Sequence, residues 1–377
     1  MNEEASLQIT WRSALMLAVC VPVLMSVLVL LWQKTERKAA IYLALFMTAA
    51  VIKVIPQIIG FAGFYAVWPG LTFAPFNVEL MFGPLLLFHA HQLMNQQPLG
   101  RLKWLLIPGI LQIIYYTWAF LFLGDYKNKW AYNNSFHEPY IIPIETVVAV
   151  LMFVFCWIKL YQLSRHYERF LEHSQSAALD FKPVWLHRLL VASLVLLVLF
   201  IITQIVPVFI TDMSYIEQFP LVVIMMLILS WVGFEAIRKL NQAFPKVTAC
   251  KAKIDDDLPS TRSWKDEARL LESQMKQEKW FLEPRLSLYD LAAALGSNET
   301  YVSRTINQGL GMSFNQYINQ WRIEFSQQLL QQPSSSVLNS ALQSGFNSKA
   351  TFNRVFKKQL GMTPSQYKKS FQTSQIK

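Results

Sequence analysis

The chain contains the stretch Tyr301-Val-Ser-Arg304 followed by Leu310-Gly-Met-Ser-Phe-Asn-Gln-Tyr317, and fifty residues later the stretch Thr351-Phe-Asn-Arg354 followed by Leu360-Gly-Met-Thr-Pro-Ser-Gln-Tyr367. The Arg, Leu, Gly, Met, Gln and Tyr positions coincide in the two copies. Only two copies are present, which indicates the duplication of one module rather than a solenoid.

Each copy is predicted to form a helix, a tight turn and a second helix. In the first copy, Ser287 can cap a helix through a capping box, Gly296 ends that helix, and Ser297 is expected to cap the next one. In the second copy, Gly345 turns the chain and Ser348 is placed to cap the following helix.

A long amphipathic helix is predicted between the copies, from about Ser313 to Leu330. Its apolar positions at 4-3-4 spacing are Phe314, Ile318, Trp321 and Phe325. At ~1.5 Å per residue the helix spans roughly 27 Å. Successive major grooves on one face of DNA lie ~34 Å apart, so such a rod can present both second helices to adjacent grooves. The sequence therefore predicts double-stranded DNA as the partner.

The polar residues of the two second helices are predicted to face outward, where they can contact DNA. Candidates for reading bases are Thr300, Ser303 and Arg304 in the first copy and Lys349, Ala350, Asn353 and Arg354 in the second. Candidates for binding phosphate are Ser297, Asn298, Ser348, Lys357, Lys358 and Lys368. The alternative is a basic helical domain with a solvated charged face, and the duplication favours the DNA reader.

Residues from about Trp280 to Lys369 resemble the DNA-binding domain of the AraC/XylS family of bacterial transcription regulators. The resemblance is carried by Leu288-x-x-Leu-Ala292, Tyr301-Val-Ser-Arg304, Gly311-Met-Ser-Phe314, Arg322, and Gly345-Phe-Asn-Ser-Lys-Ala-Thr-Phe-Asn-Arg-Val-Phe-Lys357 with Gly361-Met-Thr-Pro364. It implies sequence-specific binding through the two outward faces. Ser340 and Ser326 depart from the family pattern, which has Ile or Val and Ala there, so we expect slightly looser packing.

The first part of the chain is apolar and the second part is basic. Residues 1–245 carry 16 Lys and Arg and 13 Asp and Glu, whereas residues 246–377 carry 18 and 11, so the net charge of +10 divides as +3 and +7. This contrast predicts a membrane domain followed by a soluble domain with an anionic partner. A disordered chain is excluded because 53% of the residues are hydrophobic.

Seven apolar stretches are long enough to cross a bilayer, which takes about 20 residues. They are Ser13–Trp32, Ala39–Phe61, Leu71–Met94, Leu102–Leu123, Tyr140–Leu160, Val184–Ile210 and Phe219–Ile237. The connections after the odd-numbered stretches hold 12 Lys and Arg residues, against three on the opposite side. The positive-inside rule then predicts a multi-pass protein of the inner (cytoplasmic) membrane, with the N-terminus outside and the C-terminal domain in the cytoplasm. This first part resembles the less common seven-span membrane variant of the family.

Four polar residues interrupt these stretches: Lys53, Glu79, Glu145 and Gln204. A charge inside a bilayer is costly and usually faces the bundle interior or a wet cavity. Two interpretations stay open. One is a structural Lys–Glu pair that holds the spans together, and the other is a sensor pocket for a small-molecule or membrane-derived effector.

Three segments are expected: a membrane sensor domain (1–240), a cytoplasmic linker (241–263) and a double helix-turn-helix DNA-binding domain (264–377). A helix is predicted from about Trp264 to Trp280. Its apolar face would pack on the following domain or form a short seam of a homodimer. A signal could pass from the seventh span through the linker to this helix.

The predicted fold class is all-α: a seven-helix transmembrane bundle followed by a cytosolic seven-helix domain with two helix-turn-helix units joined by a linker helix. The predicted function is that of a membrane-anchored transcription regulator. A membrane transporter or receptor with a regulatory cytosolic tail is the alternative that the intramembrane charges suggest. An enzyme is not expected, because the sequence has no phosphate loop, no HExxH and no GxSxG. No cofactor or metal is expected, and the three cysteines are predicted to be free thiols.

Overall fold

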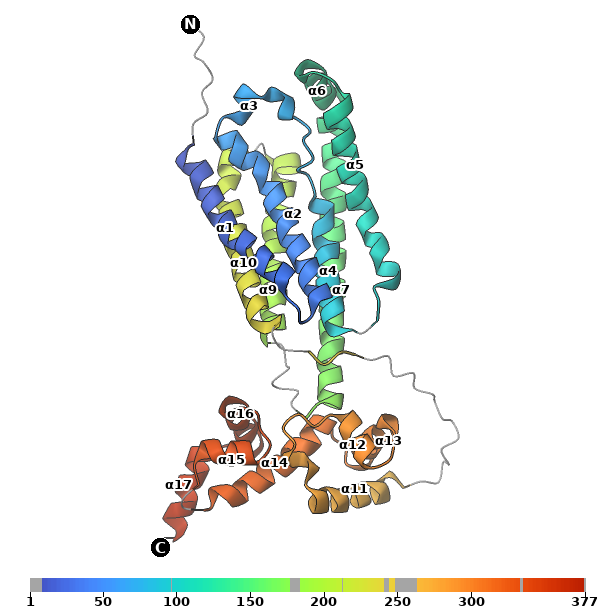
Figure 1. Ribbon diagram of the computed structural model, residues 1–377, viewed down its shortest axis with the longest axis vertical. Helices are drawn as coiled ribbons and strands as arrows, with labels where there is room; N and C mark the ends of the chain where they lie inside the picture. Colours follow the sequence, from blue (N-terminus) through green and yellow to red (C-terminus); the bar gives the residue numbers. More distant parts are fainter. Residues whose placement is uncertain are drawn as a thin grey trace. The chain divides into compact units, whose positions relative to one another are not determined.

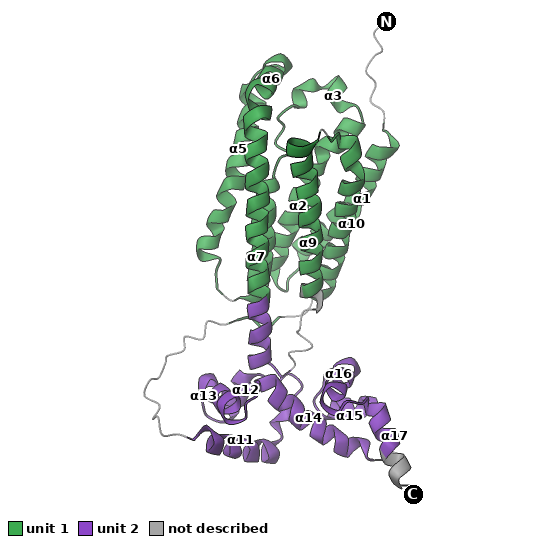
Figure 2. Ribbon diagram, turned by 180° about the vertical axis from the view of Figure 1, so that it is seen from behind, with its two compact units in different colours: residues 1–164, 184–248 green, residues 165–183, 249–377 purple. Residues whose placement is uncertain are grey.

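The computed structural model describes residues 9–95, 97–176, 184–211, 213–240, 244–247, 263–332 and 335–375. Within these residues the regular structure is helical and no β-strand occurs, which confirms the all-α prediction. The chain divides into two compact units, which are unit 1 (residues 1–164 and 184–248) and unit 2 (residues 165–183 and 249–377) (Figures 1 and 2).

Unit 1 is a bundle of long helices (Figure 1). They are α1 (Trp11–Trp32), α2 (Arg37–Phe61), α4 (Phe82–Met94), α5 (Ile107–Phe122), α7 (Ile142–Ser174), α9 (Val184–Ile205) and α10 (Tyr215–Leu240). The short helices α3 (Phe64–Val67) and α6 (Tyr126–Tyr132) lie at the end of the bundle at which α1 begins. Six helical segments of the described chain are, by length and composition, apolar and long enough to cross a membrane.

The bundle has a packed interior and an apolar exterior. Eleven of the 13 residues of α4 are buried. On α1, in contrast, Val21, Met25 and Leu28 expose more than half of their surface, at 55%, 58% and 58%. The described helices of unit 1 thus combine buried apolar residues inside with apolar residues on the outside.

The predicted third span, Leu71–Met94, is wrong in its first part. The helix begins only with the 3-10 turn η2 (Glu79–Met81) and continues as α4. Proline at Pro75 lacks the amide that a helix needs, and Phe73 has a positive φ of 66° and packs against Tyr116. About 24 Å of helix is left at ~1.5 Å per residue, which is shorter than a bilayer core. The neighbours of α4 enclose it, so this helix need not meet lipid along its whole length.

The other six predicted spans coincide with helices, with two additions. The fifth extends beyond the predicted Leu160 as far as Ser174, so that α7 begins in unit 1 and its residues from Arg165 belong to unit 2. A 3-10 turn precedes α5, and π-helical turns flank α7 and α9; these are η3 (Gly100–Leu106), η4 (Asn133–Ile141) and η5 (Val206–Ile210). Cys20 and Cys156 are buried free thiols, whereas Cys250 lies outside the described residues.

Unit 2 contains the seven helices that the sequence predicts for the C-terminal domain. They are α11 (Trp264–Glu278), α12 (Leu288–Ala294), α13 (Glu299–Arg304), α14 (Phe314–Leu330), α15 (Val337–Gln343), α16 (Lys349–Leu360) and α17 (Pro364–Gln375). The π-helical turn η7 (Thr305–Gly309) continues α13. Helices α12 and α13 form the first helix-turn-helix unit, α15 and α16 form the second, and α14 joins them (Figure 1).

Each helix-turn-helix unit has a hydrophobic core of its own, and α14 contributes to both. The first core holds Leu271, Met275, Phe281, Leu286, Leu288, Leu291, Ala292, Val302, Ile306, Phe314, Tyr317 and Ile318. The second core holds Ile323, Leu330, Ala341, Phe346, Phe352, Val355 and Phe356. Because the single helix α14 is buried in both cores, it joins the two helix-turn-helix units rigidly and not as a flexible connection.

The apolar face of α11 packs on the first helix-turn-helix unit. Ala268, Leu271 and Met275 are buried. The helix lies so close to η7 that a Cβ atom on Gly309 would stand 2.4 Å from the carbonyl oxygen of Trp264. The packing alternative for this face is therefore confirmed, and the same residues are not available for the alternative dimer seam.

The expected linker, residues 241–263, lies mostly outside the described residues. Its described part, residues 244–247, is not a free tether but is bound to unit 1. The Nζ atom of Lys246 lies 2.7 Å from Oε2 of Glu36, and the amide of Val247 donates to the carbonyl of Met94 at 2.8 Å. These four residues form no helix, as expected of a linker, and the two contacts hold them within unit 1.

Candidate DNA-reading surface and membrane cavity

The turn of the first helix-turn-helix unit is built by adjacent capping residues. Gly296 adopts a φ of 61°, and the amide of Ser297 donates to the carbonyl of Ala292 at 2.9 Å, which closes the end of α12. The cap of α13 is Asn298, whose side-chain oxygen accepts from the amide of Tyr301 at 2.7 Å. The predicted cap Ser297 is therefore wrong by one residue, because its own amide is already part of the preceding turn.

In the second helix-turn-helix unit, the turn and the helix cap lie at the predicted residues. Gly345 has a φ of 82°, which L-residues rarely adopt, and Ser348 caps α16 by accepting from the amide of Thr351 at 3.2 Å. Thr363 caps α17 in the same way, with the amide of Gln366 as donor at 3.3 Å. Local rules of capping and turn formation thus orient α16, the second helix of this unit.

Most of the predicted base-reading residues are accessible. Val302 and Phe352 face inward and are buried, which leaves the polar residues of α13 and α16 on the outer side. The exposed candidates are Lys349, Ala350 and Arg354, and the partly exposed ones are Thr300, Ser303, Arg304 and Asn353. Two of these are constrained in the free protein. Ser303 accepts from the side chain of Asn307 at 3.2 Å, and the side-chain oxygen of Asn353 is covered and has no partner among the described residues.

The six repeated positions differ in their roles: most are structural, and the arginine pair is a candidate for reading bases. The repeated Gln residues belong to capping boxes or caps, and the repeated Gly residues have φ values of 70° and 73°. The repeated Leu and Tyr residues and Met312 pack on or beside the cores, whereas Met362 is exposed. Burial raises the pKa of the Tyr317 hydroxyl, which therefore stays neutral inside the first core. Arg304 and Arg354 are the repeated charged pair, and they lie at the partly exposed and exposed sides of α13 and α16.

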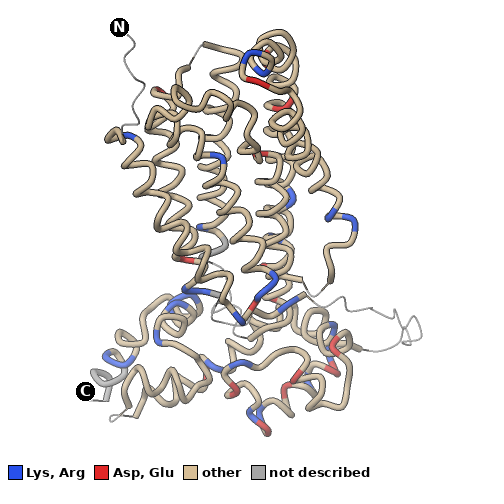
Figure 3. Tube along the Cα trace, turned by 45° about the horizontal axis from the view of Figure 1, so that its top comes forward, with Lys and Arg blue, Asp and Glu red and all other residues tan. Residues whose placement is uncertain are grey.

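Positive charge is concentrated in the second helix-turn-helix unit. Residues 264–324 contain seven Lys and Arg and eight Asp and Glu, whereas residues 325–377 contain seven Lys and Arg and no acidic residue. In Figure 3 the chain near the C-terminus is accordingly marked by basic segments without acidic ones. Lys357 and Lys358 are exposed on α16, whereas Lys368 donates to the carbonyl of Ser335. Of the three predicted lysine ligands of phosphate, Lys357 and Lys358 are thus exposed, whereas the ammonium of Lys368 already makes one hydrogen bond within the second helix-turn-helix unit. Among the other predicted ligands, Asn298 is exposed and Ser297 and Ser348 are partly exposed.

Arg322, one of the residues that carry the family resemblance, stands on α14 between the two cores, and its structural role was not predicted from the sequence. It is only 1% exposed. Its Nε donates to the carbonyl of Phe281 at 2.7 Å, its Nη2 donates to the carbonyl of Glu283 at 2.6 Å, and its guanidinium lies 5.7 Å from the ring centre of Phe346. A buried arginine with these partners holds the segment before α12 against the second helix-turn-helix unit.

The residues that directly follow α7 are hydrogen-bonded to the helix-turn-helix domain within unit 2. Ser176 is 2% exposed, its amide donates to the carbonyl of Leu286 at 3.0 Å, and its hydroxyl oxygen lies 3.2 Å from Nη2 of Arg322. The side-chain amide of Asn315 donates to the carbonyls of Gln175 and Ser176 at 3.2 and 2.6 Å. No sequence signal pointed to this segment, because its partners lie more than a hundred residues further along the chain.

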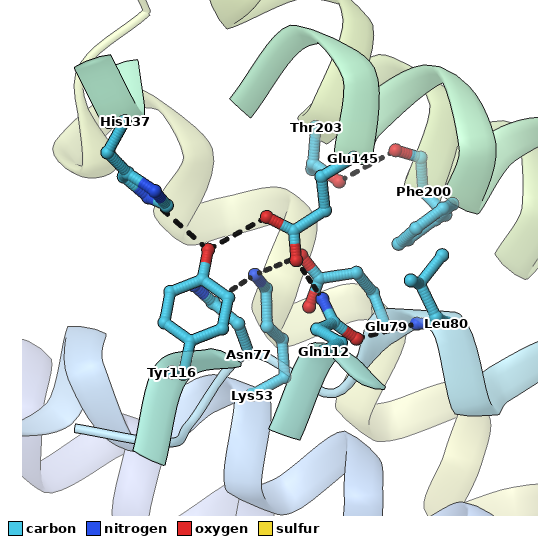
Figure 4. Close-up of polar contacts among 10 residues, drawn as sticks. All are labelled: Lys53, Asn77, Glu79, Leu80, Gln112, Tyr116, His137, Glu145, Phe200 and Thr203. Atoms are coloured by element: carbon cyan, nitrogen blue, oxygen red, sulfur yellow. Dashed lines mark hydrogen bonds and ion pairs between the residues drawn. The ribbon is translucent and has the colours of Figure 1, made fainter. Parts of the chain in front are cut away.

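Three of the predicted sensor residues of unit 1, Lys53, Glu79 and Glu145, belong to one polar network (Figure 4), and Gln204 shares a cavity wall with Lys53. Lys53 donates to Oδ1 of Asn77 at 2.8 Å and to Oε1 of Glu79 at 3.1 Å, so the expected Lys–Glu pair is present. The hydroxyl of Tyr116 donates to Oε2 of Glu145 at 2.8 Å. Each carboxylate therefore has at least one donor.

A second layer of polar residues supports Glu145, and sequence reasoning missed it. Gln112 donates to Glu145 and accepts from the amide of Leu80 at 3.2 Å. His137 lies 3.4 Å from the hydroxyl of Tyr116, which links the network to the aromatic cluster around Phe73 (Figure 4). Polar aromatic and amide residues are common in spanning helices, so only their meeting in space marks them.

A cavity of about 320 Å³ lies beside this network in unit 1. Lys53 and Gln204 line it, together with residues of α2, α7, α9 and α10. Glu79 and Glu145 do not line it; Glu79 is paired with Lys53 and Glu145 accepts from Gln112. The structure thus brings two of the four predicted sensor residues to the cavity wall. Within the described residues no group of three or more His, Cys, Asp or Glu could hold a metal.

Comparison with known proteins identifies the C-terminal part. The helix-turn-helix domain family matches residues 291–370, so this part of the chain is a helix-turn-helix domain. An uncharacterized HTH-type transcriptional regulator of Staphylococcus aureus (strain COL) is 36% identical over 83 residues, which make up 22% of this chain and 11% of the relative. The uncharacterized HTH-type transcriptional regulator YdeC of Bacillus subtilis (strain 168) is 30% identical over 152 residues, 36% of this chain and 52% of the relative.

These matches define what is known of the chain by similarity. It spans about a tenth of the length of the Staphylococcus relative and about half of the length of the Bacillus relative. No solved structure shows a significant match. DNA binding and transcription regulation are therefore supported by the relatives, whereas the activity of the whole protein is a matter for proposal.

Proposed function

We propose that this protein is a membrane-anchored transcription regulator that binds DNA in a sequence-specific manner and whose unit 1 senses a signal. The observation that carries the proposal is the repeated pair Arg304 and Arg354. The other repeated positions, with the exception of the exposed Met362, serve a cap, a turn or a core, whereas the arginines stand on the outer sides of α13 and α16. An arginine on such a helix can form two hydrogen bonds with guanine in the major groove.

The two helix-turn-helix units are expected to bind DNA with different strength. The second unit carries seven basic and no acidic residues from 325 to 377, so it supplies most of the attraction to phosphate. The first helix-turn-helix unit is nearly neutral, so its binding to DNA depends on contacts with bases. Helix α14 has 17 residues, or about 26 Å at ~1.5 Å per residue, and this length suits two units in successive major grooves.

The test is selection of binding sites from random duplexes by the full chain in lipid nanodiscs. We expect a site with two half-sites about one helical turn apart, and a log affinity that falls linearly with log salt. Arg304→Ala and Arg354→Ala should each relax the preference at one base position, at a cost of about 1–3 kcal/mol. The matched control is Lys358→Ala, which should weaken all sequences equally. The absence of a sequence-selective complex at low salt would refute the proposal.

The proposed topology places the N-terminus outside the inner membrane and unit 2 in the cytoplasm. The asymmetry of Lys and Arg between the loops supports this orientation. It is tested by single cysteines introduced into residues 124–130 and 335–340 and labelled with an impermeant maleimide in intact cells. Labelling of the second segment alone would contradict the proposal, because the reader would then lie away from the chromosome.

We propose that α7 connects sensing to DNA binding. Its residues up to Ser164 belong to unit 1, those from Arg165 belong to unit 2, and Ser176 is bound to Arg322. Coupling is reciprocal, so operator DNA must change unit 1 if unit 1 controls DNA binding. Hydrogen exchange of α2 and α9 should therefore respond to DNA, and two glycines inserted after Glu168 should abolish the response. The same insertion after Asp256 is the control and should leave the response intact.

A further inference from the structure

The cavity in unit 1 has a polar end and an apolar end. Gln57, Gln204 and Gln218 line it near the ends of α2, α9 and α10 that lie on the side of α3 and α6. One to three turns deeper, Phe200 and Leu229 line it. From Gln218 to Leu229 the wall extends about 16 Å along α10, at ~1.5 Å per residue. A molecule that fills this space has a hydrogen-bonding head and an elongated apolar tail.

The head is expected to carry no net charge. The ammonium of Lys53 is the cation at the cavity wall, and it lies 3.1 Å from Glu79, with Asn77 as a second acceptor. An anionic head would therefore meet a charge that is already neutralised, with a second carboxylate, Glu145, in the same network. A cationic head would find no carboxylate in the wall, because neither Glu79 nor Glu145 lines the cavity. In either case the buried charge of the head would lack a partner, so the free energy lost with its hydration would not be recovered.

The head is also expected to donate a hydrogen bond. The side-chain oxygen of Gln57 is buried and has no partner among the described residues, and Gln57 lines the cavity. A buried acceptor without a donor destabilises the protein, so a ligand that supplies an N–H or O–H group recovers that free energy. The side-chain amide of Gln218 donates to the carbonyl of Met213 at 3.2 Å, which leaves its own oxygen as a further acceptor.

We infer that the cavity binds an uncharged amphiphile, with an amide or hydroxyl head held by the glutamine side chains and an alkyl or acyl tail between Phe200, Met226 and Leu229. The inference deepens the proposed function and rests on it for the role of unit 1 as a sensor. The volume of about 320 Å³ lies at the lower end of the range for small-molecule sites, so the tail is a single chain and not a two-chain lipid.

The test is equilibrium binding of radiolabelled decanamide to the full chain in lipid nanodiscs, with empty nanodiscs subtracted. Decanoate and decyltrimethylammonium share the chain and differ in the charge of the head. We expect saturable binding of decanamide at one site and at least tenfold weaker binding of both ions. Met226→Trp should fill the apolar end and abolish saturable binding. Gln57→Leu, which keeps the size of the side chain, should weaken decanamide binding about tenfold and should not weaken the ions further.

Two results would overturn the inference. Binding of decanoate or of the ammonium compound as tight as that of decanamide would show that the head is recognised by charge. Saturable decanamide binding that persists in both variants would place the site elsewhere. Thermal unfolding of each variant checks that it is folded. Site selection on DNA is run on the same preparations, so a protein that selects DNA without binding decanamide overturns this inference and leaves the proposed function standing.

Discussion

Gly345 is a position at which one added methyl group should destabilise the helix-turn-helix domain, because both space and backbone conformation oppose it. A Cβ atom there would lie 2.7 Å from the carbonyl oxygen of Phe281, 2.8 Å from that of Leu282 and 3.0 Å from Nε of Arg322. These atoms are backbone or belong to a buried, hydrogen-bonded guanidinium, so they cannot move aside freely. The φ of 82° adds strain for any residue with a Cβ atom.

The magnitude follows from two additive terms. Left-handed backbone strain costs an L-residue about 1–2 kcal/mol. Forcing an extra methyl group into a packed site typically costs a further 1–3 kcal/mol, for a total of about 2–5 kcal/mol. The matched control is Gly361→Ala, because Gly361 has a φ of 73° and nothing within 4 Å of its Cβ position. Only the first term applies to it, so the two variants should differ by about 1–3 kcal/mol.

The assay is hydrogen–deuterium exchange of the full chain, read in peptides from α15 and α16. In the regime where exchange follows the opening equilibrium, a difference of about 1–3 kcal/mol corresponds to exchange about 5-fold to 150-fold faster in Gly345→Ala than in Gly361→Ala. Equal exchange in the two variants would refute the reasoning, because it would mean that the close approach to Phe281 and Leu282 has no energetic consequence.

Three further predictions concern stability, each measured by thermal unfolding of the purified chain in nanodiscs. Ser313→Ala removes the acceptor of the amide of Gln316, which lies 3.3 Å away, and should cost unit 2 about 1 kcal/mol; an unchanged transition would contradict the capping box. Ser340→Ala should stabilise unit 2 by about 1 kcal/mol, because that hydroxyl is buried without a partner among the described residues, and a loss of stability would reveal a hidden partner. Gly233→Ala should destabilise unit 1 by about 1–3 kcal/mol, since its Cβ would stand 2.7 Å from Cβ of Ser26, whereas Gly60→Ala, with its nearest atom at 3.7 Å, should cost less than 1 kcal/mol.

The features that the sequence predicts best are those set by neighbouring residues. The turn at Gly345, the cap at Ser348 and the capping box at Ser287 each depend on residues within about one helical turn, so local rules suffice. Asn298 shows the limit of such rules. Two capping residues stand side by side, and only the hydrogen bond that closes the end of α12 decides that Ser297 belongs to the turn.

The features that the sequence does not reveal depend on distant partners. Hydropathy cannot distinguish an apolar loop that packs inside the bundle from a helix that faces lipid, which is why the segment around Phe73 was predicted as helix. The pairing of Lys53 with Glu79 could be expected from charge alone. The selection of Gln112 as a partner of Glu145 could not, because it depends on how α5 is rotated against α7.

The unequal charge of the two helix-turn-helix units has a consequence for regulation. Under the proposed function, the second unit holds DNA by phosphate attraction that does not depend on the state of unit 1, whereas the nearly neutral first unit contributes sequence-dependent contacts. The segment that follows α7 is bound to Leu286, which belongs to the first core, to Asn315, which follows Phe314 of that core, and to Arg322, which stands between the two cores. A signal that arrives through α7 therefore acts on the first helix-turn-helix unit, whose binding to DNA is weak enough to be controlled. Asn315→Ala, which removes the donor to Ser176, should accordingly change occupancy of the half-site read by α13 and leave the half-site read by α16 protected in footprinting. Equal changes at both half-sites would refute this division of roles.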